Sequence, residues 1–270
     1  MKIKVDIGPY KPEPKKIISY KREAPDSFTI RLDWQIEHGP GQFVFCSAPG
    51  IGESAISICS DSRNYVDLNI REVGNVTNEL GKLQVGDELL VRGPYGTQYP
   101  MQDLKGNDFL IIGGGCGVAP LRGVIKYIDG HREDFNDISL FLGFRSPEDA
   151  LFKDEHEDWD KRHKLFMKFD KMEHENSTAC YTGSQGFVTD LVKQEVHDNT
   201  NKIAIVCGPP IMIDKTVEIL REKGFHDDQI FLSAERLMYC GMARCGRCMI
   251  RGKYTCVDGS VFRLDHFEDE

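Results

Sequence analysis

The sequence of 270 residues lacks any long hydrophobic run. Its longest apolar stretches, Phe109–Ile112 and Ile203–Cys207, are far too short to cross a bilayer. Met1–Asp6 is not followed by the apolar region of a signal peptide. No segment is dense in Lys and Arg, and the formal net charge is −9, so nucleic acid is not an expected partner. We therefore predict a cytoplasmic protein without membrane insertion.

Internal repeats and low-complexity tracts are also lacking, and the eight histidines show no spacing typical of a metal site or a catalytic triad. We therefore assign no catalytic acid–base residue. Cysteine, by contrast, is abundant, with nine residues. Disulfides are rare in the cytoplasm, where cysteines more often serve metals or redox chemistry. Five of the nine are scattered, as expected of small buried side chains, but four fall within one short window.

The four clustered residues are Cys240, Cys245, Cys248 and Cys256. Their spacing, Cys-x4-Cys-x2-Cys-x7-Cys, matches the plant-type ligation of a [2Fe–2S] cluster. Gly241 lets the loop curl, and Arg244 and Arg247 can offset the negative charge of thiolates and cluster. A structural zinc site is the alternative, although its usual form has two Cys-x2-Cys pairs and this loop has one. We favour the cluster, and a disulfide is the least expected interpretation.

The first part of the chain reads as all-β. Residues 1–16 hold three prolines and are expected to be irregular. From about Lys16 to Gly93, runs rich in β-branched and aromatic residues are separated by frequent turn residues, which predicts a small antiparallel barrel. A short helix is predicted at Asn78–Leu83, with Thr77 as its cap. The predicted strands are Phe28–Leu32, Gln42–Ser47, Ala55–Cys59, Tyr65–Ile70 and Glu88–Val91.

Beyond about Lys105, strand-like runs alternate with helical ones, which predicts a doubly wound parallel α/β sheet. One helix is expected to open at Ser146, with Ser146 as N-cap and Pro147 at the first helical position. The other expected helices are Ala119–Ile128, Gly186–Gln194 and Ile211–Lys223. The expected strands are Phe109–Ile112, Ile138–Gly143, Lys164–Phe169, Lys202–Cys207 and Gln229–Leu232.

A glycine-rich turn, GGGCGVAP at residues 113–120, follows the first of these strands. Glycine lets the backbone approach a ligand closely, and free N–H groups at a helix start favour an anion such as a pyrophosphate. Such a turn alone is a weak signal, but Cys207, Gly208 and Pro209 form a second turn after another strand. Ligands bind at this edge of open α/β sheets, so both turns indicate one nucleotide crevice.

Two residues near this crevice have alternative interpretations. Cys207 either lies beside a nicotinamide ring or is a buried small residue. Arg145 follows the second strand of the sheet, where it either meets a ribose 2′-phosphate or is an ordinary surface residue. The sequence therefore does not distinguish NAD from NADP.

The barrel, the two turns and the cysteine cluster occur in this order from about Lys16 to Phe262. In this the chain resembles the ferredoxin–NADP reductase superfamily. Within it, the chain is similar to the flavin and iron–sulfur electron-transfer subunits of NAD(P)-linked hydrogenases, anaerobic sulfite reductase and dihydroorotate dehydrogenase. The resemblance implies a flavin-binding barrel at residues 1–103, an NAD(P)-binding α/β domain at 104–235 and a cluster-binding module at 236–270.

The resemblance also implies FAD in the groove between barrel and nucleotide domain. Many relatives carry an arginine in the flavin motif, where this chain has the stretch Glu53-Ser54-Ala55-Ile56-Ser57, and Ala55 and Ser260 stand where relatives have proline. None of these differences removes a cluster ligand. The residues that match the flavin strand are Ile56, Ser57 and Ile58, and those that match the segment holding the flavin pyrophosphate are Gly74, Val76 and Thr77. The residues that match the NAD(P) site are Gly114, Gly115, Gly117, Val118, Ala119 and Pro120, with Cys207, Gly208 and Pro209.

The function implied is transfer of electrons from NAD(P)H through FAD and the [2Fe–2S] cluster to a partner, or in reverse. The expected partners are the catalytic and iron–sulfur subunits of a larger anaerobic redox complex, of hydrogenase, sulfite reductase or another type. Two other classes are retained. One is a zinc-stabilised or redox-sensing subunit that binds a partner without transferring electrons, and the other is a stand-alone NAD(P)H-dependent flavin reductase.

Overall fold

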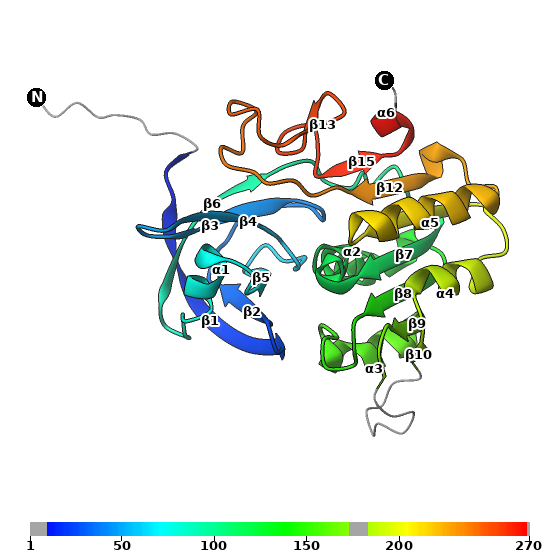
Figure 1. The fold of residues 1–270 in the computed structure, drawn as a ribbon, viewed down its shortest axis with the longest axis horizontal. Helices are drawn as coiled ribbons and strands as arrows, with labels where there is room; N and C mark the ends of the chain where they lie inside the picture. The colour runs from blue at the N-terminus through cyan, green and yellow to red at the C-terminus, as the bar shows by residue number, and fades with distance from the viewer. Residues whose placement is uncertain (1–9, 173–182, 269–270) are drawn as a thin grey trace, which may run out of the picture.

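The computed structural model of the protein describes residues 10–172 and 183–268. Two sheets stand side by side in Figure 1, and the C-terminal segment lies across the top of both in that view. No helix within these ranges has the length and apolar character needed to span a bilayer.

The N-terminal sheet is antiparallel and barrel-like, as predicted. Its six strands, in spatial order, are β4 (Gly52–Ser57), β3 (Phe43–Ala48), β6 (Glu88–Tyr95), β1 (Glu13–Ala24), β2 (Ser27–Leu32) and β5 (Val66–Arg71). Alternate side chains point inward, so that Phe28, Ile30 and Leu32 of β2 are fully buried. An isolated bridge between Ile58 and Leu68 links the chain after β4 to β5 and curls the sheet toward closure.

Strand β1 differs from the prediction, which left residues 1–16 irregular and named no strand before Phe28. It begins at Glu13, and Pro14 lies opposite Leu90 of β6. Proline is tolerated near the beginning of a strand, where its missing N–H costs no ladder bond. The charged residues that follow face solvent and hide the alternation, and Ile17 anchors the strand in the core.

The second sheet is parallel except at one edge, which confirms the predicted doubly wound sheet. Its order is β10 (Ser184–Gln185), β9 (Lys164–Phe169), β8 (Ile138–Phe144), β7 (Asp108–Gly114), β11 (Lys202–Cys207), β12 (Ile230–Ser233) and β15 (Val261–Arg263). The chain runs outward from β7 to β8 and β9, then crosses to the other side of β7 for β11 and β12. The strand order therefore reverses between β7 and β11, and such a switch point is where ligands bind in these sheets.

Helices cover both faces of the second sheet. Phe109 and Ile111 of β7 pack with α2 (Val118–Gly130) and α3 (Lys153–Arg162). Leu110 and Ile112 face the other way, toward α4 (Val188–Glu195) and α5 (Pro210–Glu222). Because both faces are buried, the strand is an apolar run without alternation. The remaining helices are α1 (Asn75–Leu80), α6 (Asp265–Glu268), η2 (Gly115–Gly117), η3 (Arg132–Asp134) and η4 (Asp227–Gln229).

Two predicted helix starts were wrong. At Ser146 the chain forms a turn, in which the Asp149 N–H donates to the Ser146 carbonyl at 3.1 Å, and α3 begins only at Lys153. Ser and Asp side chains compete with the helix by bonding locally, as the Ser146 hydroxyl does to Asp149. Helix α1 begins at Asn75, so Thr77 lies inside it and its Oγ1 accepts the N–H groups of the preceding turn.

The C-terminal segment is tied to both sheets. After β12 it forms a hairpin of β13 (Met249–Ile250) and β14 (Lys253–Tyr254), and β15 then pairs antiparallel with β12. The Thr97 hydroxyl donates to the Val261 carbonyl at 2.9 Å, and the Ser260 hydroxyl donates to the Gly41 carbonyl at 2.9 Å. These bonds hold the cysteine-rich segment over the junction of the two sheets.

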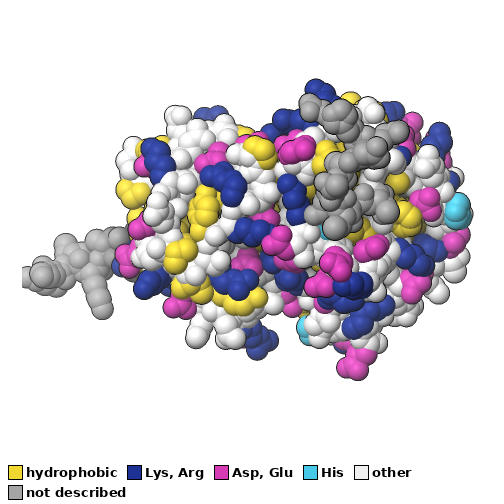
Figure 2. Space-filling view, turned by 90° about the horizontal axis from the view of Figure 1, so that it is seen from below, with side chains coloured by type: hydrophobic (Ala, Val, Ile, Leu, Met, Phe, Trp, Pro, Cys, Tyr) yellow, Lys and Arg dark blue, Asp and Glu magenta, His cyan; other side chains and the backbone are white. Residues whose placement is uncertain are grey.

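The surface seen from below mixes charges of both signs (Figure 2). Hydrophobic side chains on this face gather mainly over the barrel half. The net charge of −9 therefore does not form one continuous acidic patch on this face.

One buried arginine joins the barrel to the second sheet. The Arg122 guanidinium, on α2, donates to the Cys59 carbonyl at 2.7 Å and to Asp67 at 3.1 Å on the barrel side. It also donates to Glu155 of α3 at 2.5 Å. Burial lowers the pKa of this arginine, but its acidic partners more than offset that effect, and the net shift is upward. Arg122 therefore links the barrel to the helices of the second sheet beside the crevice.

Replacement of Arg122 by methionine is expected to destabilise the protein by about 3 kcal/mol, because it leaves buried carboxylates without one cation. Lys126→Met is the matched control, since Lys126 lies on the same helix and pairs with the same Glu155 at 3.0 Å but is more exposed. That change should cost less than about 1 kcal/mol. Urea unfolding of the two variants measures both values, and equal losses would contradict the role given to Arg122.

Candidate functional site

The two glycine-rich turns lie against each other at the ends of β7 and β11. Cys207 pairs with Gly113 in the parallel ladder, so both strands end at one level. A Cβ on Gly117 would lie 2.5 Å from the Cys207 carbonyl oxygen and 2.7 Å from the Gly208 nitrogen. Such contacts are far below van der Waals distance with backbone atoms that cannot move aside. Glycine at 117 is therefore required for the two turns to meet.

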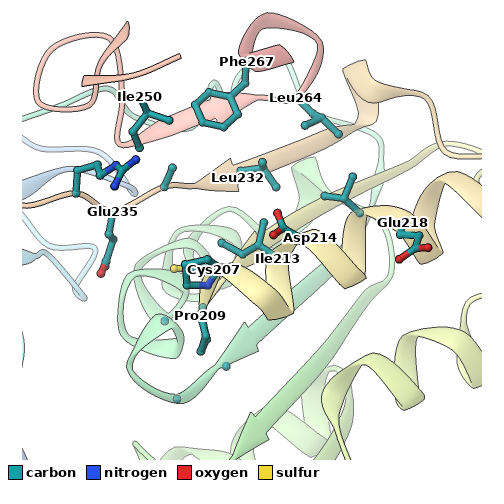
Figure 3. A pocket seen from close by; sticks show the side chains of 18 of the residues that line it. Cys207, Pro209, Ile213, Asp214, Glu218, Leu232, Glu235, Ile250, Leu264 and Phe267 are labelled. Atoms are coloured by element: carbon teal, nitrogen blue, oxygen red, sulfur yellow. The ribbon is translucent and has the colours of Figure 1, made fainter. Parts of the chain in front are cut away.

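A cleft of about 910 Å³ opens in front of these turns (Figure 3). Helices α2 and α5, which each have thirteen residues, both begin at this edge. Their unpaired N–H groups and dipoles favour an anionic group there. At Gly115, which has φ +54°, an added Cβ would meet nothing within 4 Å, so the backbone lies open to the cleft. This geometry suits a diphosphate.

The cleft borders all three parts of the chain. Arg71 comes from the end of β5 in the barrel, and Ile250 and Arg251 come from the cysteine-rich segment. The α/β domain supplies six of the predicted nucleotide residues, namely Gly114, Gly115, Gly117, Cys207, Gly208 and Pro209. Val118, Ala119 and Pro120 are buried in the first turn of α2 and support the helix start without lining the cleft.

Arg145 lies apart from the large cleft. It is exposed at the end of β8 and lines a small neighbouring pocket with Asp26, Arg71 and Cys116. Arg71 is held there by an ion pair with Asp26 at 2.7 Å. The small pocket continues along the same edge of the sheet, between the barrel and the turn after β7.

Several cleft residues were not predicted, among them three with reactive or charged side chains. Cys116 is exposed within the glycine-rich turn, Arg71 ends a barrel strand, and Glu235 follows β12 by two residues. Glu235 is exposed and lines the cleft, and desolvation of its carboxyl raises the pKa. Glu235 follows a third strand that ends at the same edge, and this position was a signal available in the sequence.

Cys207 is 1% exposed, and burial raises the pKa of its thiol well above the usual range. The thiol therefore stays protonated and neutral at physiological pH. A neutral thiol at the base of the cleft is compatible with a flat aromatic ring beside it. It does not provide a thiolate nucleophile.

The segments that match a flavin site lie together on the barrel. Helix α1 packs against β4, and a Cβ on Gly52 would lie 3.4 Å from Val76. Ile56 and Ile58 turn their side chains into the barrel core, so from this strand the half-buried Ser57 and the backbone face outward. Gly74 is exposed at the start of α1, whereas Thr77 is buried with its hydroxyl bonded to the preceding backbone. These segments do not line the large cleft.

The four clustered cysteines share one compact region. The Cys248 and Cys256 sulfurs lie 3.3 Å apart and are buried in a small core with Phe43, Phe45 and Met238. Cys245 is exposed and Cys240 half-buried on the outer side. Within residues 10–172 and 183–268, no three His, Cys, Asp or Glu side chains converge closely enough to hold a single metal ion.

Backbone N–H groups of the loop point at the sulfurs. Met242 and Arg244 donate to the Cys240 sulfur at 3.4 and 3.3 Å, and Ala243 donates to the Cys256 sulfur at 3.2 Å. Burial raises the pKa of Cys240, but the backbone hydrogen bonds outweigh it and bring the pKa to about 7. Cys256, by contrast, has a pKa raised to about 12 by burial. Four thiols in one loop region, two of which accept N–H hydrogen bonds at their sulfurs, fit the ligand set of an iron–sulfur cluster.

Comparison with known families and proteins agrees with this geometry. Residues 111–218 match the family model described as an oxidoreductase NAD-binding domain. The chain is 36% identical to the gamma subunit of sulfhydrogenase 2 from Pyrococcus furiosus, over 95% of this chain and 96% of that one. It is 31% identical to a probable dihydroorotate dehydrogenase B (NAD(+)) electron transfer subunit from Methanocaldococcus jannaschii, over 89% and 85% of the two chains.

A solved structure of similar fold comes from a study of flavin-based electron bifurcation by the NADH-dependent reduced ferredoxin–NADP oxidoreductase. It superposes with a TM-score of 0.78 at 26% identity, over 94% of this chain and 89% of that chain. The similarity therefore extends through the barrel, the α/β sheet and most of the C-terminal segment.

Proposed function

Because this chain belongs to the oxidoreductase family of the sulfhydrogenase gamma subunits and the dihydroorotate dehydrogenase electron-transfer subunits, we propose that it carries electrons within a larger complex. They pass between NAD(P)H, FAD and a [2Fe–2S] cluster, to or from a partner catalytic subunit. The partner is of the hydrogenase or sulfite reductase type, and the setting is cytoplasmic. The three functional units are residues 1–103, 104–235 and 236–270.

The observation that carries this proposal is the cleft bordered by all three units. The turns at β7 and β11 offer a diphosphate site, Arg71 approaches from the barrel, and Ile250 approaches from the cysteine-rich segment. When bound, FAD accepts hydride from NAD(P)H and releases electrons singly, and the cluster relays them. The chain supplies position, because the turns hold the nucleotide where barrel and cluster segment meet.

Residues of the chain also control charge and water around the reacting groups. The neutral Cys207 thiol closes the base of the cleft without adding charge. Gly115 leaves room for the nucleotide, Gly117 lets the two turns meet, and the starts of α2 and α5 compensate the phosphates of the nucleotide. Ser57 and the segment from Gly74 to Thr77 hold the flavin on the barrel side. Arg145, which lines the small pocket beside the turn after β7, is the residue that would contact a ribose substituent.

Composition of the anaerobically purified protein tests this proposal. We expect one FAD, two irons and two sulfides per chain, with flavin absorbance that bleaches on addition of NADH or NADPH. Zinc without iron would instead support a structural, partner-binding role. Rapid turnover of a physiological small acceptor by the isolated chain, without any other subunit, would favour the stand-alone reductase.

A further inference from the structure

Arg92 lies where the barrel meets the cysteine-rich segment. It is on β6, opposite Phe45 of β3, and its side chain is 3% exposed. Its guanidinium stacks on the Phe45 ring at 4.0 Å from the centroid. A charged group is buried at such a site only when its hydrogen bonds are satisfied.

All five N–H groups of Arg92 have partners. Nε and one N–H of Nη2 bind the Glu53 carboxylate at 2.7–3.1 Å. One N–H of Nη1 is bonded to the Tyr95 hydroxyl at 3.0 Å. The remaining two donate to the carbonyls of Tyr239 and Cys240, each at 3.0 Å. A planar fork can satisfy this set, whereas an ammonium group cannot.

The partners come from two functional parts of the chain. Glu53 begins the stretch of β4 that leads to Ser57 on the flavin side, and Cys240 is the first cysteine of the cluster loop. The loop fits closely here, because a Cβ on Gly241 would lie 2.9 Å from the Phe45 ring. Glu53 therefore binds Arg92 and, through it, the cluster loop.

We propose that Arg92, oriented by Glu53, is the positioning residue that sets the geometry and electrostatic environment of the cluster loop relative to the flavin strand. This inference rests on the proposed function. The bidentate ion pair with Glu53 fixes the orientation of the Arg92 guanidinium. The guanidinium in turn holds two successive carbonyls, those of Tyr239 and of the first cluster cysteine, Cys240. The two charges also act on the cluster, because the buried Arg92 cation and the half-buried Glu53 carboxylate nearly cancel, and removal of either leaves a net charge beside it.

Substitutions of the two members of the ion pair are expected to shift the cluster potential in opposite directions. Glu53→Gln leaves the cation uncompensated and should raise the cluster potential, whereas Arg92→Gln leaves the carboxylate and should lower it. Each shift should change the ratio of reduced to oxidised cluster by about tenfold, equivalent to about 59 mV for one electron. Arg92→Lys keeps the charge but loses bonds to the loop, so the potential should stay close to wild type. Electron transfer from flavin to cluster should slow by about tenfold or more.

The test uses the full chain loaded with FAD and iron under anaerobic conditions. Redox titration followed by electron paramagnetic resonance gives the potential, and stopped-flow absorbance separates flavin bleaching by NADH from cluster bleaching. Flavin bleaching should keep its wild-type rate in every variant. Arg22→Gln is the matched control, since Arg22 also binds a barrel carboxylate, Glu72, and lies over aromatic rings, but is far along the chain from the loop.

Opposite shifts for Glu53→Gln and Arg92→Gln, with none for Arg22→Gln, support the inference. Unchanged potentials and cluster rates in both variants would overturn it, even if their melting temperatures fell, because loss of a purely structural pair lowers stability alone. If Arg92→Gln does not fold, Glu53→Gln and Arg92→Lys decide the matter. A wild-type chain without iron would refute the proposed function itself, which is a different result.

Discussion

Cys248→Ser is expected to yield a protein that still accepts electrons from NAD(P)H but lacks the iron–sulfur cluster that would pass them on. Cys248 is 1% exposed, and its sulfur lies 3.3 Å from that of Cys256. Iron–sulfur clusters require soft thiolate ligands, and a serine hydroxyl is a poor substitute. Iron and sulfide should fall to near zero, while flavin content and the rate of flavin bleaching by NADH stay close to wild type.

Iron and sulfide analysis, with visible absorbance before and after NADH, measures this outcome. Cys46→Ser is the matched control, because Cys46 is equally buried but lies in the barrel core away from the loop. That variant should keep its iron even if its stability falls. A Cys248→Ser protein with the full complement of iron would show that Cys248 is not a ligand.

Gly117→Ala should strongly slow the transfer of electrons from NAD(P)H to the flavin. The added Cβ would lie 2.5 Å from the Cys207 carbonyl oxygen and 2.6 Å from its carbon. Because φ of Gly117 is −63°, the backbone itself tolerates alanine, and the clash alone causes the effect. The two turns must separate, and a displacement of about 1 Å at a reactive site can cost about 100-fold in rate.

Stopped-flow bleaching of the flavin by NADH and NADPH measures this loss, and we expect a rate about 100-fold lower. Dithionite should still reduce both flavin and cluster, since their sites are untouched. Gly130→Ala, at the end of the same helix, meets only Asp61 at 3.9 Å and should behave as wild type. A wild-type rate for Gly117→Ala would mean that the nucleotide does not use this crevice.

The fold class was predictable because its signals are local. The strands Lys164–Phe169 and Lys202–Cys207 occur at the predicted residues, and the second is the continuous apolar run expected of a buried parallel strand. The barrel was predictable from the regular spacing of its turns. The cysteine spacing and the glycine turns are equally local patterns, and for this reason the sequence could indicate them.

Other features depend on contacts between distant parts of the chain. Arg122 meets Asp67 across 55 residues, and Arg92 meets Cys240 across 148. No local pattern marks either arginine, because their partners become neighbours only after the sheets pack. The wrong helix start at Ser146 has a local cause by contrast, because the Ser146 hydroxyl bonds Asp149 within a turn and α3 begins only at Lys153.

The central claim is that one chain connects a nicotinamide site, a flavin and an iron–sulfur cluster in that order. Anaerobic stopped-flow mixing of the oxidised protein with NADH, with flavin and cluster followed at separate wavelengths, tests it most directly. The account predicts flavin bleaching first and cluster bleaching second, with the second phase absent in Cys248→Ser and the first slowed in Gly117→Ala. Flavin bleaching in wild type with no change in the cluster, at any NADH concentration, would contradict it.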